Sequence, residues 1–404
     1  MILTGDCRVV MATMEAESVD AVVTDPPAGI SFMSKHWDDD HGGRDKWIAD
    51  FAAIFRECYR VMKPGAHGLV WALPRTSHWT ATALEDAGFE VRDVLLHLFG
   101  SGFPKSHDVS KAIDKAAGAE REVVETRRVQ RSSRSWECGT GMLAPGEQNF
   151  DRTAPATDAA RTWAGWGTAL KPAAEHWILV RKPIQGTVAA CVLKHGTGAL
   201  NIDATRIGTT VETWPATRSG GGGYMVKHRG DKGPTEATGA APPGRWPANV
   251  ILSHGECADG ICAESCPVRM LDEQSGDTGA NGGGVNRASR ARQSGFGMTA
   301  GPSVECDNSG GASRFFYTSK ASRADREGST HLTMKPTDLM RWLCKLVTPP
   351  NGLILDPFCG SGSTGVAAVA EDFRFIGIEQ DAEYVAIAER RIANVAPLFG
   401  EVSL

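Results

Sequence analysis

The stretch LDPFCGSGSTG, residues 355–365, decides the fold of this 404-residue chain. The apolar run that leads into it, residues 353–355, predicts a buried strand, and the residues after it predict a helix from Thr364 to Ala370. A strand, a glycine-rich turn and a helix in this order direct backbone N–H groups and the positive end of the helix at an anionic ligand. Glycine allows a close approach, and the lack of a lysine before the final Ser or Thr disfavours a triphosphate.

A carboxylate further along the chain supports a ligand that contains a nucleoside. The next apolar run ends in Ile378-Glu379, about twenty residues on, where the acid can accept hydrogen bonds from ribose hydroxyls. A glycine loop followed by such an acid also fits a dinucleotide, so this pattern alone leaves both classes of cofactor open.

Both ends of the chain alternate short apolar runs with helical stretches. Near the amino end, residues 21–23 and 68–71 predict strands, and residues 47–62 predict a helix that stops at Lys63-Pro64-Gly65. Residues 336–395 repeat this alternation. The pattern predicts an α/β fold with a mostly parallel sheet, helices on both faces, and strands from both ends of the chain.

Between these ends the sequence becomes polar and glycine-rich, as in residues 219–223 and 281–284, with few periodic segments. We therefore expect a large loop-rich insertion that interrupts the sheet. A recognition or lid role is the preferred interpretation, because long insertions of this kind are usually functional. Disordered decoration is the alternative.

Composition limits the class of protein. A hydrophobic content of 41% suffices for a full core, and no stretch reaches the roughly 20 apolar residues that span a bilayer. The start MILTGDCRVV has no basic region followed by an apolar one, so we expect a cytoplasmic protein with no membrane partner. Ten irregularly spaced cysteines indicate reduced thiols, and a net charge of −5 requires nucleic-acid binding to come from local clusters.

A second stretch, TDPPAGI at residues 24–30, follows a predicted strand. Together with residues 355–365 and with HLTMKP at 331–336, it resembles the amino-group DNA methyltransferases. Its position before the glycine loop resembles the permuted beta class of that family. Two departures are Leu332, which replaces the usual proline, and Ala28, which stands where the family carries an aromatic residue.

Two further stretches, GSGFPK at 100–105 and WGTALKP at 166–172, resemble a bacterial and phage subgroup of the family. The resemblance implies an S-adenosylmethionine-dependent methyltransferase sheet in three parts. Residues 1–104 would be its catalytic half, residues 105–314 a target-recognition insertion, and residues 315–404 its cofactor-binding half.

The resemblance implies S-adenosylmethionine as the cofactor. It assigns cofactor contacts to side chains and loop residues from four segments, namely Asp6, Cys7, Lys335, Asp356, Phe358, Gly360, Ser361, Gly362 and Glu379. The weakest of these signals is Gly5-Asp6-Cys7, because Gly-Asp before a helix is equally an ordinary amino-terminal cap.

The chemistry expected of residues 24–30 is methylation of an exocyclic amine. Such an amine is a poor nucleophile because its lone pair is delocalised into the ring, so acceptors for both amine hydrogens are needed. The carboxylate of Asp25 and the carbonyl of Pro26 would accept them, on a loop stiffened by Pro26 and Pro27. Asp25 could then remove the proton.

Ala28 is the anomaly of the predicted catalytic set. A base that leaves the duplex stack is normally received by an aromatic face, and base–aromatic stacking contributes roughly 1–3 kcal/mol. We interpret Ala28 as an engineered, inactivating substitution. The alternatives are a naturally inactive enzyme, or replacement of the missing aromatic by Phe32 or Trp37.

The acceptor base is left open between adenine N6 and cytosine N4. Asp before Pro-Pro resembles the adenine-modifying majority, so adenine is preferred. Methylation of cytosine C5 is disfavoured, because it needs a Pro-Cys nucleophile loop and the chain offers only Cys266-Pro267, in the reverse order.

Four arginines fall within eight residues of the insertion and suit phosphate contacts, namely Arg127, Arg128, Arg131 and Arg134. A solvated helix face is the alternative, since Glu120, Glu122 and Glu125 lie nearby. The partner expected from these features is double-stranded DNA.

Four soft ligands for one zinc ion follow in the same insertion, namely His254, Cys257, Cys262 and Cys266. Their spacing lacks the tight Cys-x-x-Cys knuckle that makes such sites easy to identify. Ordinary thiols are the alternative.

A homodimer and a cognate restriction enzyme are further partners that the family resemblance suggests. Two other functions stay open: a DNA-binding protein that does not catalyse transfer, and an amino-methyltransferase that acts on RNA or on glutamine side chains of proteins. The permuted order and the large insertion favour DNA.

Overall fold

The computed structural model describes most of the chain. The described residues are 1–30, 38, 42–100, 102, 106–131, 146–208, 244–254, 257, 262–264, 266–276, 310–319 and 334–395, with the side chains of 129–131 and 146–148 excepted. Within them the chain divides into two compact units, of which the larger comprises residues 1–100, 174–322 and 335–404 and the smaller comprises 101–173 and 323–334.

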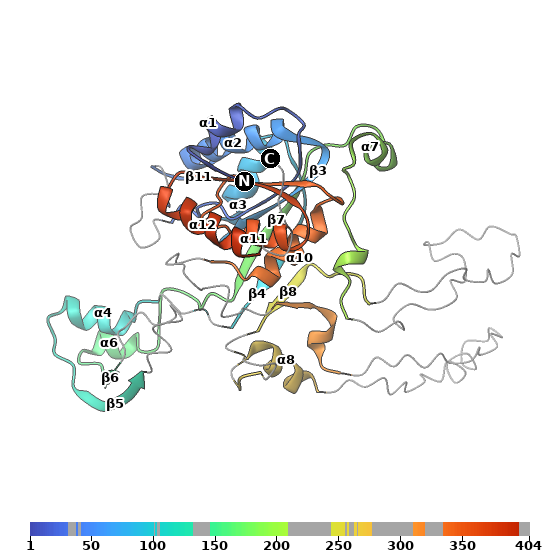
Figure 1. The fold of residues 1–404 in the computed structure, drawn as a ribbon. Coiled ribbons are helices and arrows are strands. Elements are labelled where there is room, and N and C mark those ends of the chain that lie inside the picture. Colours follow the sequence, from blue (N-terminus) through green and yellow to red (C-terminus); the bar gives the residue numbers. More distant parts are fainter. Residues whose placement is uncertain are drawn as a thin grey trace, which may run out of the picture. The chain divides into compact units, whose positions relative to one another are not determined.

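Nine strands of the larger unit form one sheet in the order β1-β11-β10-β2-β3-β7-β4-β8-β9 (Figure 1). In chain order they are β1 (Ile2–Thr4), β2 (Val19–Thr24), β3 (Met62–Ala72), β4 (Glu90–Leu98), β7 (Ala174–Arg181), β8 (Val250–Ser253), β9 (Tyr317–Ser319), β10 (Leu353–Asp356) and β11 (Arg374–Glu379). Of these strands only β7 runs antiparallel to its neighbours. The carboxyl ends of the other eight therefore meet at one edge, where α/β sheets place their ligands.

Two layers of helices cover the sheet, one on each face (Figure 1). Val22 of β2 packs in the cluster that contains α1 (Cys7–Ala12), α2 (Arg44–Val61) and α3 (Ser77–Asp86). Its neighbours Ala21 and Val23 pack with α10 (Thr337–Val347), α11 (Ser363–Ala370) and α12 (Ala382–Val395). Alternate residues of this fully buried strand thus pack against the helices on opposite faces of the sheet. The predicted mostly parallel α/β sheet with helices on both faces is confirmed.

The predicted end of the first long helix is confirmed, because that helix stops at Val61, just before Lys63-Pro64-Gly65. The sequence did not predict that these three residues lie inside β3. Pairing of β3 with β2 is irregular between Met62 and His67, so the proline ring occupies a stretch that needs no ladder hydrogen bond from its nitrogen.

The segment predicted to be wholly inserted contributes to the sheet. Strands β7 and β8 both lie within residues 105–314, and β7 is the strand between β3 and β4. Leu98 at the end of β4 is paired with Ala174 at the start of β7. The larger unit also contains α7 (Val188–His195), α8 (Pro267–Ser275) and two short 3-10 helices, η3 (Asp203–Thr205) and η4 (Ala312–Phe315).

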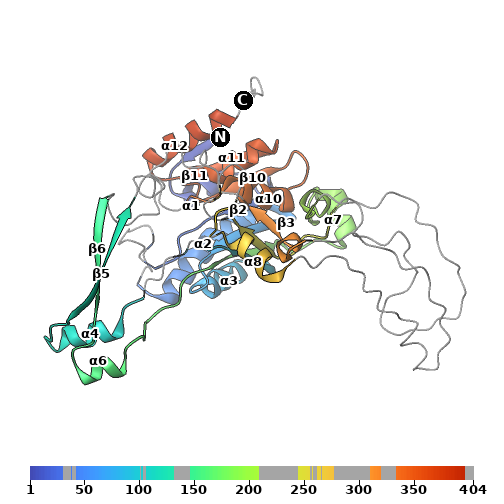
Figure 2. The ribbon, with the colours of Figure 1, turned by 90° about the horizontal axis from the view of Figure 1, so that it is seen from below.

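The smaller unit is built around a hairpin of β5 (Val123–Arg131) and β6 (Gly146–Thr153), which is drawn beside α4 (Val109–Ala116) and α6 (Asp158–Thr162) in Figure 2. Its centre is the buried carboxylate of Asp114, which accepts hydrogen bonds from Arg121, Ala156 and Thr157. These bonds hold the pKa of Asp114 at about 2, against the opposing effect of burial. Among the described residues no helix is long and apolar enough to cross a membrane.

Candidate active site

The two loops identified in the sequence lie side by side, because β2 and β10 are adjacent parallel strands. At their carboxyl ends the hydroxyl of Thr24 donates a hydrogen bond of 2.6 Å to Oδ1 of Asp356, across 332 residues of sequence. The backbone N–H of Phe358 donates to the same oxygen at 3.1 Å. The Asp25-Pro26-Pro27 loop and the glycine loop are thereby joined through one buried carboxyl group.

Asp356 is only 2% exposed, and its burial raises the pKa of the carboxyl group to about 6. Hydrogen bonds from Thr24, Thr364 and the Phe358 N–H act in the opposite direction. The negative charge of Asp25 adds to the upward shift. Two carboxyl groups at one sheet edge therefore influence each other's ionisation.

The glycine loop is fixed from several sides. Gly362 has a φ of +81°, and a Cβ there would lie 2.9 Å from Cβ of Ala388 on α12. The guanidinium of Arg391, also on α12, donates to the backbone carbonyl and the hydroxyl of Ser361. The ring of Phe358 stacks on Phe51 with centroids 5.8 Å apart. These contacts with α12 and α2 fix the conformation of the loop.

Glu379 lies at the end of β11, next to the glycine loop. Its Oε2 accepts the N–H of Gly360 at 2.8 Å, and its Oε1 accepts the N–H groups of Gln380 and Asp381 at 2.9 Å each. A carboxylate has about four lone-pair positions, so the capacity to accept ribose hydroxyls remains. Its predicted role is compatible with this position and stays a prediction.

Asp6 forms the amino-terminal cap of α1. Its carboxylate accepts the N–H of Arg8 at 2.9 Å and pairs with the Arg8 guanidinium, which lowers the pKa of Asp6. The adjacent Gly5 N–H donates to the carbonyl of Glu379, which places this cap beside β11. Burial raises the pKa of the neighbouring Cys7 thiol to about 11. A cofactor contact of Asp6 or Cys7 remains a prediction.

Asp25 is paired with Lys335, whose ammonium lies 2.8 Å from Oδ2. The Lys335 side chain is 9% exposed and its ammonium lies 4.1 Å from the ring centroid of Trp71. Burial raises the pKa of Asp25 although Lys335 opposes the shift. Burial alone would lower the pKa of Lys335, but the carboxylates of Asp25 and Glu175 outweigh it and raise that pKa. The ammonium of Lys335 thus forms an ion pair with Asp25 and is also stabilised by the negative charge of Glu175.

The second of these acids, Glu175, belongs to a row of polar side chains along the same edge. His97 Nδ1 lies 3.4 Å from Glu175 Oε2, and His97 Nε2 lies 2.6 Å from the hydroxyl of Ser253. Burial alone would raise the pKa of Glu175, but Lys335, His97 and Trp71 hold it at about 2. Glu175, His97 and Trp71 were not predicted from the sequence. Each lies beside the end of an apolar run, and this position could have marked them as candidate site residues.

The loop after Asp25 is pinned by side chains from elsewhere in the larger unit. Oδ1 of Asp38 accepts the N–H groups of Ala28 and Gly29 at 2.6 and 2.9 Å. The hydroxyl of Thr76 donates to the carbonyl of Ala28 at 3.0 Å. Phe32 and Trp37, the predicted substitutes for an aromatic at position 28, lie outside the described residues.

Three of the four predicted DNA-contacting arginines, Arg127, Arg128 and Arg131, lie on a strand, so the alternative assignment of these three to a helix face is wrong. Arg127 and Arg128 are exposed residues of β5, paired with Phe150 and Asn149 of β6. Arg131 ends the strand, and its side chain and all of Arg134 lie outside the described residues. Alternating β-branched and charged residues in this stretch were the sequence signal for a strand.

The four predicted metal ligands do converge. The nitrogen and sulfur atoms of His254, Cys257, Cys262 and Cys266 all lie within 4.8 Å of one another. The predicted cofactor and catalytic residues gather at the ends of β2, β10 and β11, and the four metal-ligand candidates gather after β8.

Comparison with known proteins gives matches to part of the chain. Residues 279–390 match the family model described as DNA methylase. Over 88 residues the chain is 36% identical to the type II methyltransferase M.HinfI of Haemophilus influenzae, which covers 22% of this chain and 24% of that protein. Over 66 residues it is 39% identical to the DNA adenine methyltransferase YhdJ of Escherichia coli (strain K12), covering 16% and 22%. The matched stretches span less than a quarter of each relative.

Among solved structures, TTHA0409 of Thermus thermophilus, named as a candidate DNA modification methylase, overlays with a TM-score of 0.41 and 14% sequence identity. The overlay covers 99% of this chain and 97% of that chain.

Proposed function

We propose that this chain is a DNA methyltransferase that uses S-adenosylmethionine to methylate an exocyclic amino group of a base in double-stranded DNA. The observation that carries the proposal is the junction of the Asp25 loop and the glycine loop through Thr24 and Asp356. The junction brings the Asp25 loop, proposed to bind the amine, beside the glycine loop, proposed to bind the cofactor, and a direct transfer requires these two groups to be adjacent. The match of residues 279–390 to the DNA methylase family supports the same class.

The residues present fit this cofactor. Gly360 and Gly362 both have positive φ, which shapes the tight turn, and the N–H of Gly360 holds the Glu379 carboxylate beside this turn, where it could accept a ribose hydroxyl. Phe358 offers an aromatic surface next to them. When bound, S-adenosylmethionine supplies an electrophilic methyl group on a sulfonium.

Asp25 would accept a hydrogen of the target amine and localise the nitrogen lone pair toward the methyl group. Because burial raises the pKa of Asp25, the same carboxylate is suited to hold the proton released afterwards. Lys335 keeps Asp25 ionised before the transfer. Trp71, beside this pair, is a candidate surface for the extruded base.

Adenine N6 is the proposed acceptor, and cytosine N4 is the alternative. The acid before Pro-Pro supports adenine, as does the local similarity to a DNA adenine methyltransferase. A second function, DNA binding without transfer, is favoured by Ala28, which provides no aromatic face at the catalytic loop.

The test is transfer of labelled methyl from S-adenosylmethionine into mixed-sequence duplex DNA, followed by digestion to nucleosides. Ala28→Tyr should label DNA roughly fivefold to 150-fold faster than the chain as it stands, by the stacking contribution of roughly 1–3 kcal/mol. Asp25→Asn in the Ala28→Tyr background is the control and should abolish the signal.

Label in N6-methyl-2′-deoxyadenosine supports the preferred acceptor, and label in N4-methyl-2′-deoxycytidine supports the alternative. If Ala28→Tyr binds both S-adenosylmethionine and DNA yet transfers nothing, noncatalytic binding replaces the proposal. Labelling of RNA or protein instead of DNA overturns the substrate class.

A further inference from the structure

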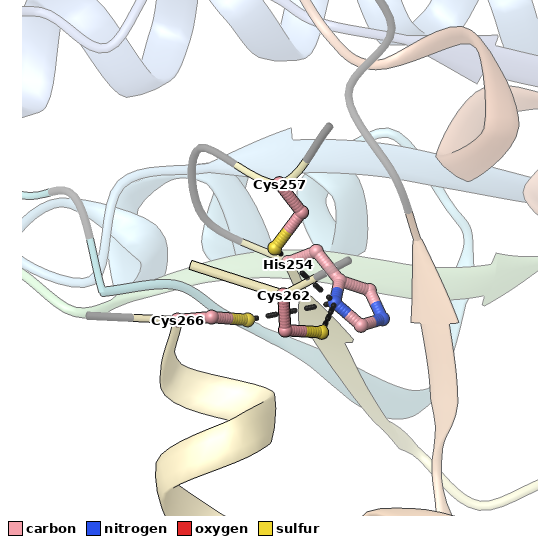
Figure 3. Close-up of side chains that lie close together, drawn as sticks. All are labelled: His254, Cys257, Cys262 and Cys266. Atoms are coloured by element: carbon pink, nitrogen blue, oxygen red, sulfur yellow. Dashed lines mark hydrogen bonds between the residues drawn. The ribbon is translucent and has the colours of Figure 1, made fainter. Parts of the chain in front are cut away.

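Four potential metal ligands surround a single point at the end of β8 (Figure 3). His254 directly follows that strand, Cys257 and Cys262 come from the next loop, and Cys266 is the amino-terminal cap of α8. Nδ1 of His254 lies 3.7 Å from Sγ of Cys257, 3.4 Å from that of Cys262 and 3.5 Å from that of Cys266. The three sulfurs therefore surround one ring nitrogen at almost equal distance.

Hydrogen bonding does not account for this arrangement. Nδ1 of a neutral imidazole carries either one hydrogen or one lone pair, so it forms one good hydrogen bond. Three thiols cannot each have that bond. A cation bound by all four atoms explains the convergence, because every ligand then points at the same centre.

The three nitrogen-to-sulfur spacings match those expected around a zinc ion. Zinc binds sulfur at about 2.3 Å and imidazole nitrogen at about 2.0–2.1 Å in a tetrahedron, which requires a nitrogen-to-sulfur spacing of about 3.6 Å. The three spacings in this structure lie between 3.4 and 3.7 Å. We propose that His254, Cys257, Cys262 and Cys266 bind one Zn²⁺ ion.

The donor set identifies the class of metal and its role. Thiolates and imidazole favour zinc over magnesium or calcium, which prefer oxygen ligands. Four protein ligands leave no position for water or substrate, so the site is structural and not catalytic. The proposal rests on these four residues alone and is independent of the methyltransferase activity.

Among the described residues, the apolar cluster around the four ligands has few buried members, so a bound metal would add stability there. Its buried members are Leu252, Cys266 and Val268. A core of this size stabilises little, and small regions commonly rely on a metal instead. The ion would clamp α8 to the end of β8. Asp272 of α8 in turn accepts the N–H and hydroxyl of Ser313 in η4, which extends the clamp to the segment before β9.

The clamp also lies next to the row of polar side chains at the sheet edge. Ser253, the residue before His254, is bonded to His97 at 2.6 Å and to the hydroxyl of Ser319 at 2.8 Å. Metal binding would fix the ends of β8 and β9, and through them the position of His97.

The first experiment measures the metal content of the full-length chain, purified without chelators, by mass spectrometry of the elements. We expect about one zinc per chain, and Cys262→Ser and Cys257→Ser should each retain less than a tenth of it. Cys191→Ser is the matched control, because Cys191 is buried in the same unit, donates to the Pro64 carbonyl and lies outside the cluster. It should retain the full content.

A second measurement uses the unsubstituted chain and therefore does not depend on whether the cysteine variants fold. The wild-type chain, freed of metal and titrated with Co²⁺, should develop the thiolate-to-cobalt charge-transfer absorption and lose it when zinc is added. Re-addition of zinc should raise the melting temperature. Absence of bound metal together with no Co²⁺ spectrum, a disulfide among the three cysteines, or iron as the purified metal each overturns the zinc assignment.

Discussion

Asp356 combines deep burial, two hydrogen bonds and a carboxyl group whose pKa is about 6 in the folded chain. In the unfolded chain the same group has its ordinary pKa of 3.8. Between these two values the folded state binds a proton that the unfolded state has lost. The free energy of unfolding therefore falls as the pH rises through this window.

Replacing Asp356 with Asn should remove this pH dependence. Asn keeps the Oδ1 acceptor for Thr24 and Phe358 but cannot ionise. Relative to the variant, the wild-type chain should lose roughly 3 kcal/mol of unfolding free energy between pH 4 and pH 6.5, from a shift of about two pKa units. Urea unfolding at a series of pH values measures this, and parallel curves for the two proteins would contradict it.

Lys335 is the cation on which the ionised form of Asp25 depends. Lys335→Met should destabilise the fold by about 3 kcal/mol, the lower end of the range for breaking a buried pair, since the Asp25 side chain keeps 23% exposure. Adding Asp25→Asn should recover part of the loss. Chemical denaturation of both single variants and the double variant gives the coupling, and purely additive effects would exclude a specific pair.

At the scale of elements, the glycine loop is the most constrained turn of the site. Gly362 has a φ of +81° and lies against Ala388 of α12, so a side chain there would collide with a helix. Gly196, at the carboxyl end of α7, has a similar φ of +76° but no atom within 4 Å of the position of its missing Cβ. A comparison of substitutions at the two glycines therefore separates the cost of backbone strain from the cost of steric collision.

Gly362→Ala should therefore cost more than Gly196→Ala. The latter carries only the left-handed backbone penalty of about 1–2 kcal/mol, while the former adds displacement of α12. Gly362→Ala should also weaken S-adenosylmethionine binding more than tenfold, measured by calorimetry, with Gly196→Ala unchanged. Equal effects of both changes on binding would remove Gly362 from the cofactor loop.

The sequence predicted the elements whose determinants are local. The helices near residues 47–62 and 337–346 and the strand at 353–355 were found from periodicity, because each has a clear apolar face or a fully apolar run. The end of the helix before Lys63-Pro64-Gly65 was predicted, but the strand that contains these residues was not, because proline and glycine normally end regular structure. Here an irregular strand pairing tolerates them.

The site was predicted only in part, for a related reason. Asp25, Lys335 and Asp356 were identified one by one from local motifs, yet their contacts depend on strand order, which local patterns do not determine. Glu175 was not predicted because its charge acts on Lys335 only in a sheet where β7 lies between β3 and β4.

At the scale of the whole molecule, a net charge of −5 coexists with three arginines, Arg127, Arg128 and Arg131, on strand β5 of the smaller unit. Arg127 and Arg128 project from consecutive positions of β5, so they lie on opposite faces of the hairpin. A β-hairpin that lies along a DNA duplex can contact phosphates with both of its faces. We expect the smaller unit to supply much of the affinity for DNA.

Changing Arg127 and Arg128 together to Gln should weaken duplex binding about equally for all sequences. The slope of log affinity against log salt should fall by about one to two, one for each phosphate that is no longer neutralised. Arg152 and Arg161 changed together to Gln are the matched control, because the charge change is the same and both are already paired with carboxylates. An unaltered slope in the first variant would place the DNA-binding surface elsewhere.

The antiparallel pairing of β4 with β7 has a consequence for how such proteins can diversify. Leu98 and Ala174 face each other across that pair, so the polypeptide leaves the sheet and re-enters it at neighbouring points. Everything between them is topologically the tip of a hairpin, and a turn of a few residues would suffice to close it. Residues 101–173, the larger segment of the smaller unit, are therefore an insertion between two paired strand ends. A different sequence could replace this segment at the same two points while the strand order stays intact.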